Sequence, residues 1–145
     1  MLAFNKARAK FYPYNEVYLE APKKAINLPE GSPTKHQYVR LDSYVPNKEI
    51  VSRKYTQLSE VSEETAIRYL KELSDKYAPE TKIADVPSNI SGANAGIFKA
   101  NNGKVLDGQM ILEVPVQAKA VPKKVIDYAN KHYIKIRDIN GKIYS

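Results

Sequence analysis

The sequence contains no cysteine among its 145 residues. Disulfide bonds, thiolate metal ligands and cysteine nucleophiles are therefore excluded together, although this absence does not settle the cellular compartment. No apolar run reaches the roughly eighteen residues that a membrane-spanning helix needs. The first residues, MLAFNKARAKFYPYN, lack an apolar segment followed by small residues, so we expect no signal peptide there.

Several well-known catalytic motifs are absent as well. The chain has no P-loop, no dinucleotide-binding GxGxxG, no zinc-binding HExxH and no GxSxG nucleophile elbow. Its two histidines, His36 and His132, have no supporting motif, and a histidine general-base pair would need them to meet. We predict that His36 lies in a turn and that His132 ends a helix, where the helix dipole favours a cation.

Length and composition fit one soluble globular domain. Hydrophobic residues make up 43% of the chain and charged residues 27%, which is ordinary for such proteins. The length suffices for one hydrophobic core. We therefore treat residues 1–145 as a single domain, which would also suit the C-terminal piece of a longer protein, and we expect a monomer.

The formal net charge is +7, and the excess is mostly lysine spread along the chain. A basic surface attracts polyanions and suits a nucleic-acid partner. No basic run is dense enough to be diagnostic, however, and a solvated lysine-rich surface explains the charge equally well. The eleven tyrosines could stack on bases, but tyrosine is also a common core and rim residue.

Hydrophobic periodicity and turn residues predict an α/β (α+β) fold with a mixed sheet and flanking helices. Ser62 is a suitable N-cap for the long amphipathic helix, and Asn140–Gly141 is the strongest hairpin signal. Pro115 suggests that its strand lies at an edge or has a bulge. In chain order we predict a helix in residues 14–26, strands in 38–44 and 49–58, a helix in 62–77, a loop in 78–108, a strand in 109–117, a helix in 121–132 and a hairpin in 133–145.

The first predicted hairpin, RLDSYVPNKEIVSRKYTQL, concentrates charged and polar residues. If residues 46–48 form the turn, Asp42 faces Ser52 and Arg40 faces Lys54, all on one side of the sheet. An even-length turn would instead place Arg53 opposite Asp42. A carboxylate and an ammonium on one face could bind a divalent cation and stabilise a developing oxyanion. The simpler interpretation is a cross-strand ion pair on a solvated face.

The segment LDSY followed by IVSRK resembles the D-…-(E/S/Q)-x-K core of PD-(D/E)xK nucleases, in which the aspartate and lysine lie on neighbouring strands of a hairpin. Ser52 stands at the usual glutamate position. This is similar to the serine-bearing nuclease domains at the C-termini of contact-dependent growth inhibition toxins and related polymorphic bacterial toxins. The resemblance spans Glu16 to Gln117 and implies a restriction-endonuclease-like core.

By this resemblance, Asp42 is a metal ligand, Lys54 is the catalytic lysine and Ser52 replaces the glutamate. Gln57 would contact substrate or water, and Glu16 or Glu20 would supply a metal-binding carboxylate from an upstream helix. The resemblance also implies Zn²⁺ or Mg²⁺, a DNA substrate in preference to tRNA, and a cognate immunity protein. It further implies a secreted or surface-delivered toxin that acts in the cytoplasm of a target cell.

Asp107 and Glu113 mimic a second acidic motif, but Pro115 stands where its lysine would be. We predict that Asp107 lies in a turn and that Glu113 pairs with a nearby base; an active Glu113 would move the nuclease centre. Two other functions stay open. One is a non-catalytic basic binding module, and the other is a metal-independent ribonuclease toxin built on His36 or His132.

Overall fold

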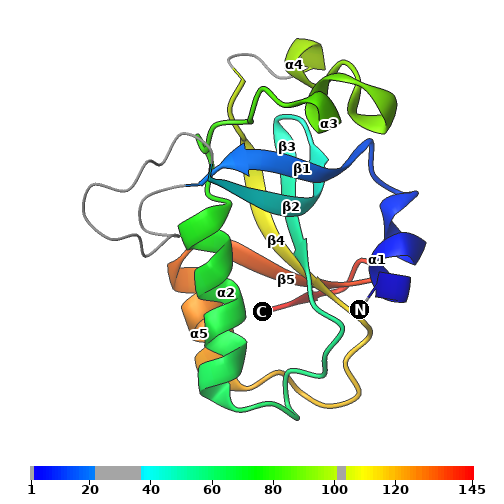
Figure 1. Cartoon of the computed structure of the whole chain (residues 1–145). Coiled ribbons are helices and arrows are strands. Elements are labelled where there is room, and N and C mark those ends of the chain that lie inside the picture. Colours follow the sequence, from blue (N-terminus) through cyan, green and yellow to red (C-terminus); the bar gives the residue numbers. More distant parts are fainter. Residues whose placement is uncertain (1, 22–36, 101–103) are drawn as a thin grey trace.

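Six strands form one mixed sheet and follow one another across it in sequence order (Figure 1). The computed structural model describes residues 2–21, 37–100 and 104–145. The strands are β1 (Tyr14–Glu20), β2 (Tyr38–Val45), β3 (Lys48–Arg53), β4 (Gly108–Val114), β5 (Ile134–Asp138) and β6 (Ile143–Tyr144). The helices are α1 (Leu2–Ala9), α2 (Glu63–Lys76), α3 (Pro87–Ile90), η2 (Gly92–Asn94), α4 (Ile97–Ala100) and α5 (Lys123–Lys131). The arrangement agrees with the predicted α+β class.

Strand direction changes at β3. Strands β1, β2 and β3 are antiparallel, whereas β3, β4 and β5 run parallel, and β6 returns antiparallel to β5. The parallel pairs need long crossover connections, which contain α2 and α5. These two helices pack side by side on one face of the sheet, and α1 lies away from them (Figure 1).

The core lies between the sheet and the α2–α5 pair. Helix α2 begins at Ser62, whose hydroxyl accepts a hydrogen bond from the Thr65 backbone N–H. Its apolar stripe of Ala66, Leu70 and Leu73 is fully buried. Sheet residues of alternating position complete this core, namely Ile50, Met110, Leu112, Val114, Ile134 and Ile136. The alternation leaves the other face of β3, β4 and β5 to a different set of side chains.

The helix predicted over residues 14–26 is wrong. Residues 14–20 form strand β1, residues 22–26 lie outside the described part, and the helix occurs earlier, as α1. Val17 and Leu19 are fully buried with less buried residues between them, so the segment follows the two-residue period of a strand. Pairing with β2 outweighs the helical spacing that the same residues also allow.

The remaining element predictions agree with the structure, except for their ends. The strand predicted over 49–58 ends at Arg53, and the predicted loop 78–108 contains the short helices α3, η2 and α4. Gly141 adopts a φ of 88° in the final hairpin, as the Asn–Gly pair predicts. Pro115 follows directly after β4, which lies between β3 and β5, so the expected edge strand or bulge is not observed.

Candidate active site at the fork between β2 and β3

Strands β2 and β3 pair only beside their shared turn. Ser43, Tyr44 and Val45 oppose Val51, Ile50 and Glu49, which confirms the predicted register beside the turn, but the predicted pairs Asp42–Ser52 and Arg40–Lys54 are not part of the ladder. Beyond Ser43, β2 stays paired with β1, whereas the end of β3 pairs with β4. The two strands therefore separate, and Asp42 stands at the fork where they part.

The fork gives Asp42 a defined hydrogen bond. Its Oδ2 accepts the backbone N–H of Arg53 at 2.7 Å, where the separating strands leave that N–H without a β2 carbonyl partner. Burial raises the pKa of the Asp42 carboxyl, and the Arg53 N–H and the charges of Arg53 and Lys54 only partly offset this effect. The pKa consequently lies above its ordinary value, which is frequent among functional carboxyl groups.

Alternation along the chain assigns Ser52, and Lys54 just after the end of β3, to the face of the sheet covered by α2, whereas Asp42 lines a cavity together with Arg53 and residues of α1. The Lys54 Nζ lies 3.4 Å from the Glu72 carboxylate on α2, and it lies over the Tyr69 ring. Ser52 is 2% exposed. No hydrogen bond joins Asp42 to Lys54 among the described side chains, but the charges of Lys54 and Glu72 both act on the pKa of Asp42.

Glu16 and Asp42 line one cavity of about 220 Å³ beneath α1. The neighbouring pairs Asn15–Ser43 and Val17–Leu41 place Glu16 opposite Asp42. Glu16 has a φ of 51°, which is uncommon for a residue with a side chain. The cavity is lined by Leu2, Asn5, Lys6, Ala9, Asn15, Glu16, Asp42 and Arg53.

Glu20 lies away from this cavity. It pairs with Tyr38, four residues along the strand from Glu16, a distance of about 13 Å in extended chain. Its carboxylate lies 3.7 Å from the Lys82 ammonium on the surface. Both glutamates lie on β1 and not on a helix, and α1, with the sequence LAFNKARA, contains no acid, so the expected helix carboxylate is wrong in its location.

Helix α1 contributes an amide to the cavity in place of an acid. The Oδ1 atom of Asn5 is buried and has no hydrogen-bond partner within the described ranges. Within those ranges no group of three or more histidine, aspartate or glutamate side chains is placed to hold a metal ion. Among the side chains that line the cavity, oxygen donors are offered by Asp42, Glu16 and the amides of Asn5 and Asn15, and the Asn15 oxygen already accepts from Ser43.

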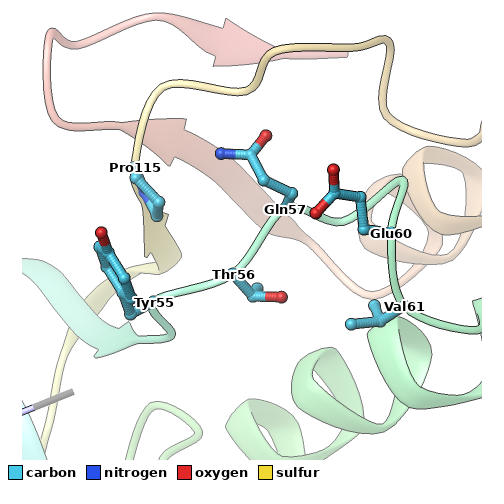
Figure 2. Close-up of a pocket in the computed structure, with 6 residues that line it drawn as sticks. All are labelled: Tyr55, Thr56, Gln57, Glu60, Val61 and Pro115. Atoms are coloured by element: carbon cyan, nitrogen blue, oxygen red, sulfur yellow. The ribbon is translucent and has the colours of Figure 1, made fainter.

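Gln57 is held by the protein backbone at both ends of its amide. Its Nε2 donates to the Val116 carbonyl at 2.9 Å, and its Oε1 accepts from the Ala118 N–H at 2.8 Å. Gln117 reciprocates, accepting from the Leu58 N–H at 2.8 Å and donating to the Thr56 carbonyl at 3.0 Å. The two glutamines join the β3–α2 loop to the chain after β4, beside a cavity lined partly by Gln57 (Figure 2). This contact gives Gln57 a structural role that the sequence did not reveal.

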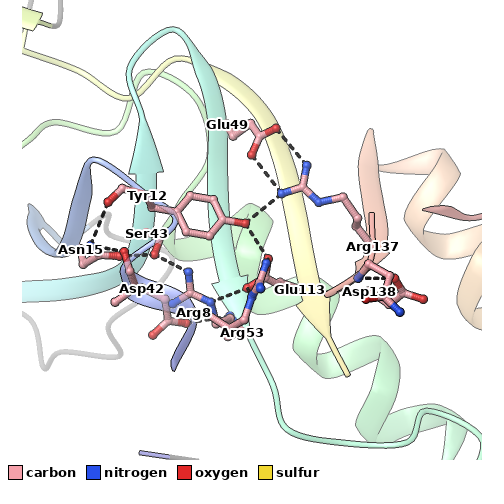
Figure 3. Close-up of polar contacts among 12 residues, drawn as sticks. Arg8, Tyr12, Asn15, Asp42, Ser43, Glu49, Arg53, Glu113, Arg137 and Asp138 are labelled. Atoms are coloured by element: carbon pink, nitrogen blue, oxygen red, sulfur yellow. Dashed lines mark hydrogen bonds and ion pairs between the residues drawn. The ribbon is translucent and has the colours of Figure 1, made fainter. Parts of the chain in front are cut away.

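The opposite face of β3 and β4 contains a buried ionic network (Figure 3). Arg53 Nε donates to the Glu113 carboxylate at 2.6 Å, and both side chains are almost fully buried. Arg8 and Tyr12 donate to the same carboxylate at 3.2 and 2.5 Å. Burial raises the pKa of Glu113, but hydrogen bonds from these three donors outweigh that effect and lower the pKa overall. The prediction that Glu113 pairs with a base is confirmed.

The network extends across the sheet through Tyr12. The Tyr12 hydroxyl accepts from Arg137 at 2.9 Å, and Arg137 binds both oxygens of Glu49 at 2.9 and 3.0 Å. Arg53 also donates to the Ser43 hydroxyl, which donates to Asn15. The sequence contains no local signal for these contacts, because their members are far apart in the chain.

Two other candidate residues, His132 and Asp107, occupy structural positions. His132 ends α5, as predicted, and it stacks on Tyr128 with ring centroids 4.2 Å apart. His36 lies outside the described residues. The Asp107 N–H donates to the Tyr44 hydroxyl at 3.0 Å, just before β4.

Across the described ranges, no helix has the length and apolarity to cross a membrane. Comparison with known proteins found no matching family model, no matching curated protein and no matching solved structure.

Proposed function

We propose that this chain is a metal-dependent nuclease domain that acts at the fork between β2 and β3. The observation that carries the proposal is the position of Asp42: it stands where two strands part, shares a cavity with Glu16 and accepts the backbone N–H of Arg53, the residue before Lys54. The order of hairpin β2–β3, helix α2 and strand β4 fits the PD-(D/E)xK resemblance, although strand β1 stands where a helix was predicted before the hairpin. On that resemblance alone, the domain is a bacterial toxin neutralised by an immunity protein.

The available donors suit a hard divalent cation such as Mg²⁺. Asp42 keeps one carboxylate oxygen beyond its bond to the Arg53 N–H, and Glu16 and the unpartnered Asn5 Oδ1 face the same cavity. A bound cation would favour the ionised form of Asp42, whose pKa is raised without it. Such an ion supplies polarisation of the phosphate and a more acidic water.

Lys54 supplies the mobile positive charge of the proposed site. Its ion pair with Glu72 is partly exposed, and such pairs contribute little to stability. The flexible ammonium can therefore leave Glu72 and stabilise negative charge that develops on a phosphodiester. Ser52, two residues earlier, is only 2% exposed and does not line the cavity, so Lys54 and not Ser52 is the residue of this segment that we place against the substrate. The net charge of +7 favours binding of the nucleic-acid backbone.

A digestion assay tests this proposal. Plasmid DNA, total RNA and a single-stranded oligonucleotide are incubated with the protein, with and without a chelator. We expect chelator-sensitive cleavage that Asp42→Asn and Lys54→Ala each abolish. Glu20→Gln is the control because it removes an acid of the neighbouring strand β1 that lies away from the cavity, and it should cleave normally. Cleavage that persists with chelator or in Asp42→Asn would refute the proposed mechanism.

A second candidate function is a basic module that binds nucleic acid without cleaving it. It is favoured by the lack of a three-acid metal cluster among the residues the structure describes. The same assay separates the two functions, because the binding module would retain nucleic acid in a gel-shift experiment while leaving every substrate intact.

A further inference from the structure

A second cavity, of about 420 Å³, lies beyond the end of β3. It is lined by Tyr55, Thr56, Gln57, Glu60, Val61 and Pro115. Tyr55 and Pro115 lie on one side of it and Glu60 and Val61 on the other, with Thr56 between them (Figure 2). This volume is within the range of small-molecule sites in proteins. Tyr55 directly follows Lys54, so the cavity adjoins the proposed active site.

The walls of this cavity are held in place before any ligand arrives. The reciprocal bonds of Gln57 and Gln117 fix the loop on which the lining residues lie. The Tyr55 ring packs against Phe4 of α1 with centroids 5.3 Å apart, yet Tyr55 remains 67% exposed. A supported but exposed aromatic ring can stack on a planar ligand with little loss of conformational freedom.

The polar groups of the cavity favour a base over a phosphate. Glu60 is exposed, and its carboxylate makes no hydrogen bond or ion pair with the described residues. A free carboxylate repels phosphate groups, but it accepts hydrogen bonds from amino groups such as the N4 amino group of cytosine. A phosphate is better suited to the ammonium of Lys54, which directly precedes Tyr55 in the chain.

We propose that this cavity binds one unpaired nucleobase of the substrate, which stacks on Tyr55 and donates its amino group to Glu60. In a duplex the same base is already stacked and its amino group already paired, so it is not free to enter. The inference rests on the proposed nuclease function and narrows it to single-stranded or looped nucleic acid. It assigns a substrate class to a cavity separate from the one that holds Asp42 and Glu16.

Binding measurements in chelator test the stacking separately from cleavage. Fluorescence anisotropy compares a labelled single strand with the corresponding duplex. We expect the wild-type protein to prefer the single strand, and Tyr55→Ala to weaken that binding about tenfold or more while Tyr55→Phe retains it. Tyr133→Ala is the control, because Tyr133 is 83% exposed and precedes β5 at the other end of the sheet. Equal losses for Tyr55→Ala and Tyr133→Ala, or no preference for single strands, would overturn the inference.

Base preference tests the role of Glu60. We expect cytosine tracts to bind more tightly than thymine tracts, and Glu60→Gln to remove most of this difference. Glu64→Gln makes the same charge change on an exposed acid of α2 and should preserve the difference. A preference that survives Glu60→Gln would refute the contact. Single-strand binding that depends on Tyr55 without any cleavage would contradict the nuclease proposal alone, whereas cleavage indifferent to Tyr55→Ala would contradict the inference alone.

Discussion

Arg53 and Glu113 stand beside each other on the parallel strands β3 and β4, and their side chains form an ion pair 2.6 Å long with almost no solvent exposure. Arg53 thereby links two parts of the molecule. Its side chain anchors the buried network, while its backbone N–H holds the carboxylate of Asp42 on the other side of the fork. The network is therefore the support on which the proposed site rests.

Glu113→Gln should strongly destabilise the fold. The substitution leaves the Arg53 guanidinium buried without its counter-charge, which costs about 3–5 kcal/mol in comparable buried pairs. Urea denaturation measures the free energy of unfolding. Asp127→Asn is the control, because it breaks the exposed Lys123–Asp127 pair and should change stability by less than about 0.5 kcal/mol. Similar small effects for both variants would contradict a supporting role for Glu113.

The contribution of Glu113 should disappear in acid. Its pKa in the folded protein lies below the value of about 4.3 expected for an unfolded glutamate. Its stabilising effect is therefore complete above that unfolded value and is lost as the pH falls through the lower folded value. We expect the difference in unfolding free energy between wild type and Glu113→Gln to narrow between about pH 5 and pH 2. A difference that stays constant over this pH range would refute the lowered pKa of Glu113 in the folded protein.

Asp42→Asn should affect the free energy of unfolding in the opposite direction from Glu113→Gln. Burial raises the pKa of Asp42 above the unfolded value of about 3.9, so its neutral form favours the fold. That contribution is present below the unfolded pKa and is lost as the pH rises through the folded pKa. At neutral pH the asparagine variant, which can still accept the Arg53 N–H, should therefore be at least as stable as wild type while lacking activity. Destabilisation at neutral pH would show that Asp42 is a structural residue.

Much of the hairpin could be predicted because its signals are local. The turn after Val45 sets the register of the pairs beside it, in which Ser43 opposes Val51 and Tyr44 opposes Ile50. Strand β1 was missed because its apolar residues fit a helix as well as a strand, and only pairing with β2 decides between them.

The fork and the network depend on contacts between distant parts of the chain. Asp42 is at a fork because β3 continues along β4, more than fifty residues later in the chain, after its pairing with β2 has ended. The same pairing places Arg53 beside Glu113, and no local pattern gives the register of two parallel strands joined by a long crossover. The sequence predicts that Glu113 needs a basic partner, but it cannot identify Arg53 as that partner.

Gln57→Ala should weaken the fold by about 1 kcal/mol, because it removes hydrogen bonds to two backbone groups. Gln117→Ala should have a similar effect, since it bridges the same two loops. The double variant should lose less than the sum of the single losses, because either glutamine alone depends on the loop spacing that both maintain. Urea denaturation of the wild type, the two single variants and the double variant measures this coupling in the free energy of unfolding. A different outcome would support a direct catalytic role for Gln57. In that case the effects of the two substitutions on stability would add fully, and Gln57→Ala would lower kcat without changing stability.

Glu16→Gln and Glu20→Gln separate the two acids of β1. Only Glu16 shares a cavity with Asp42, whereas Glu20 lies beside Lys82 on the surface. We expect Glu16→Gln to lower cleavage and Mg²⁺ affinity about tenfold or more, and Glu20→Gln to leave both unchanged. Mg²⁺ affinity is measured without substrate, from the rise of the melting temperature with metal concentration, because an ion that binds only the folded protein stabilises it. If Mg²⁺ raises the melting temperature of wild type and Glu16→Gln equally, the ion does not bind between Glu16 and Asp42.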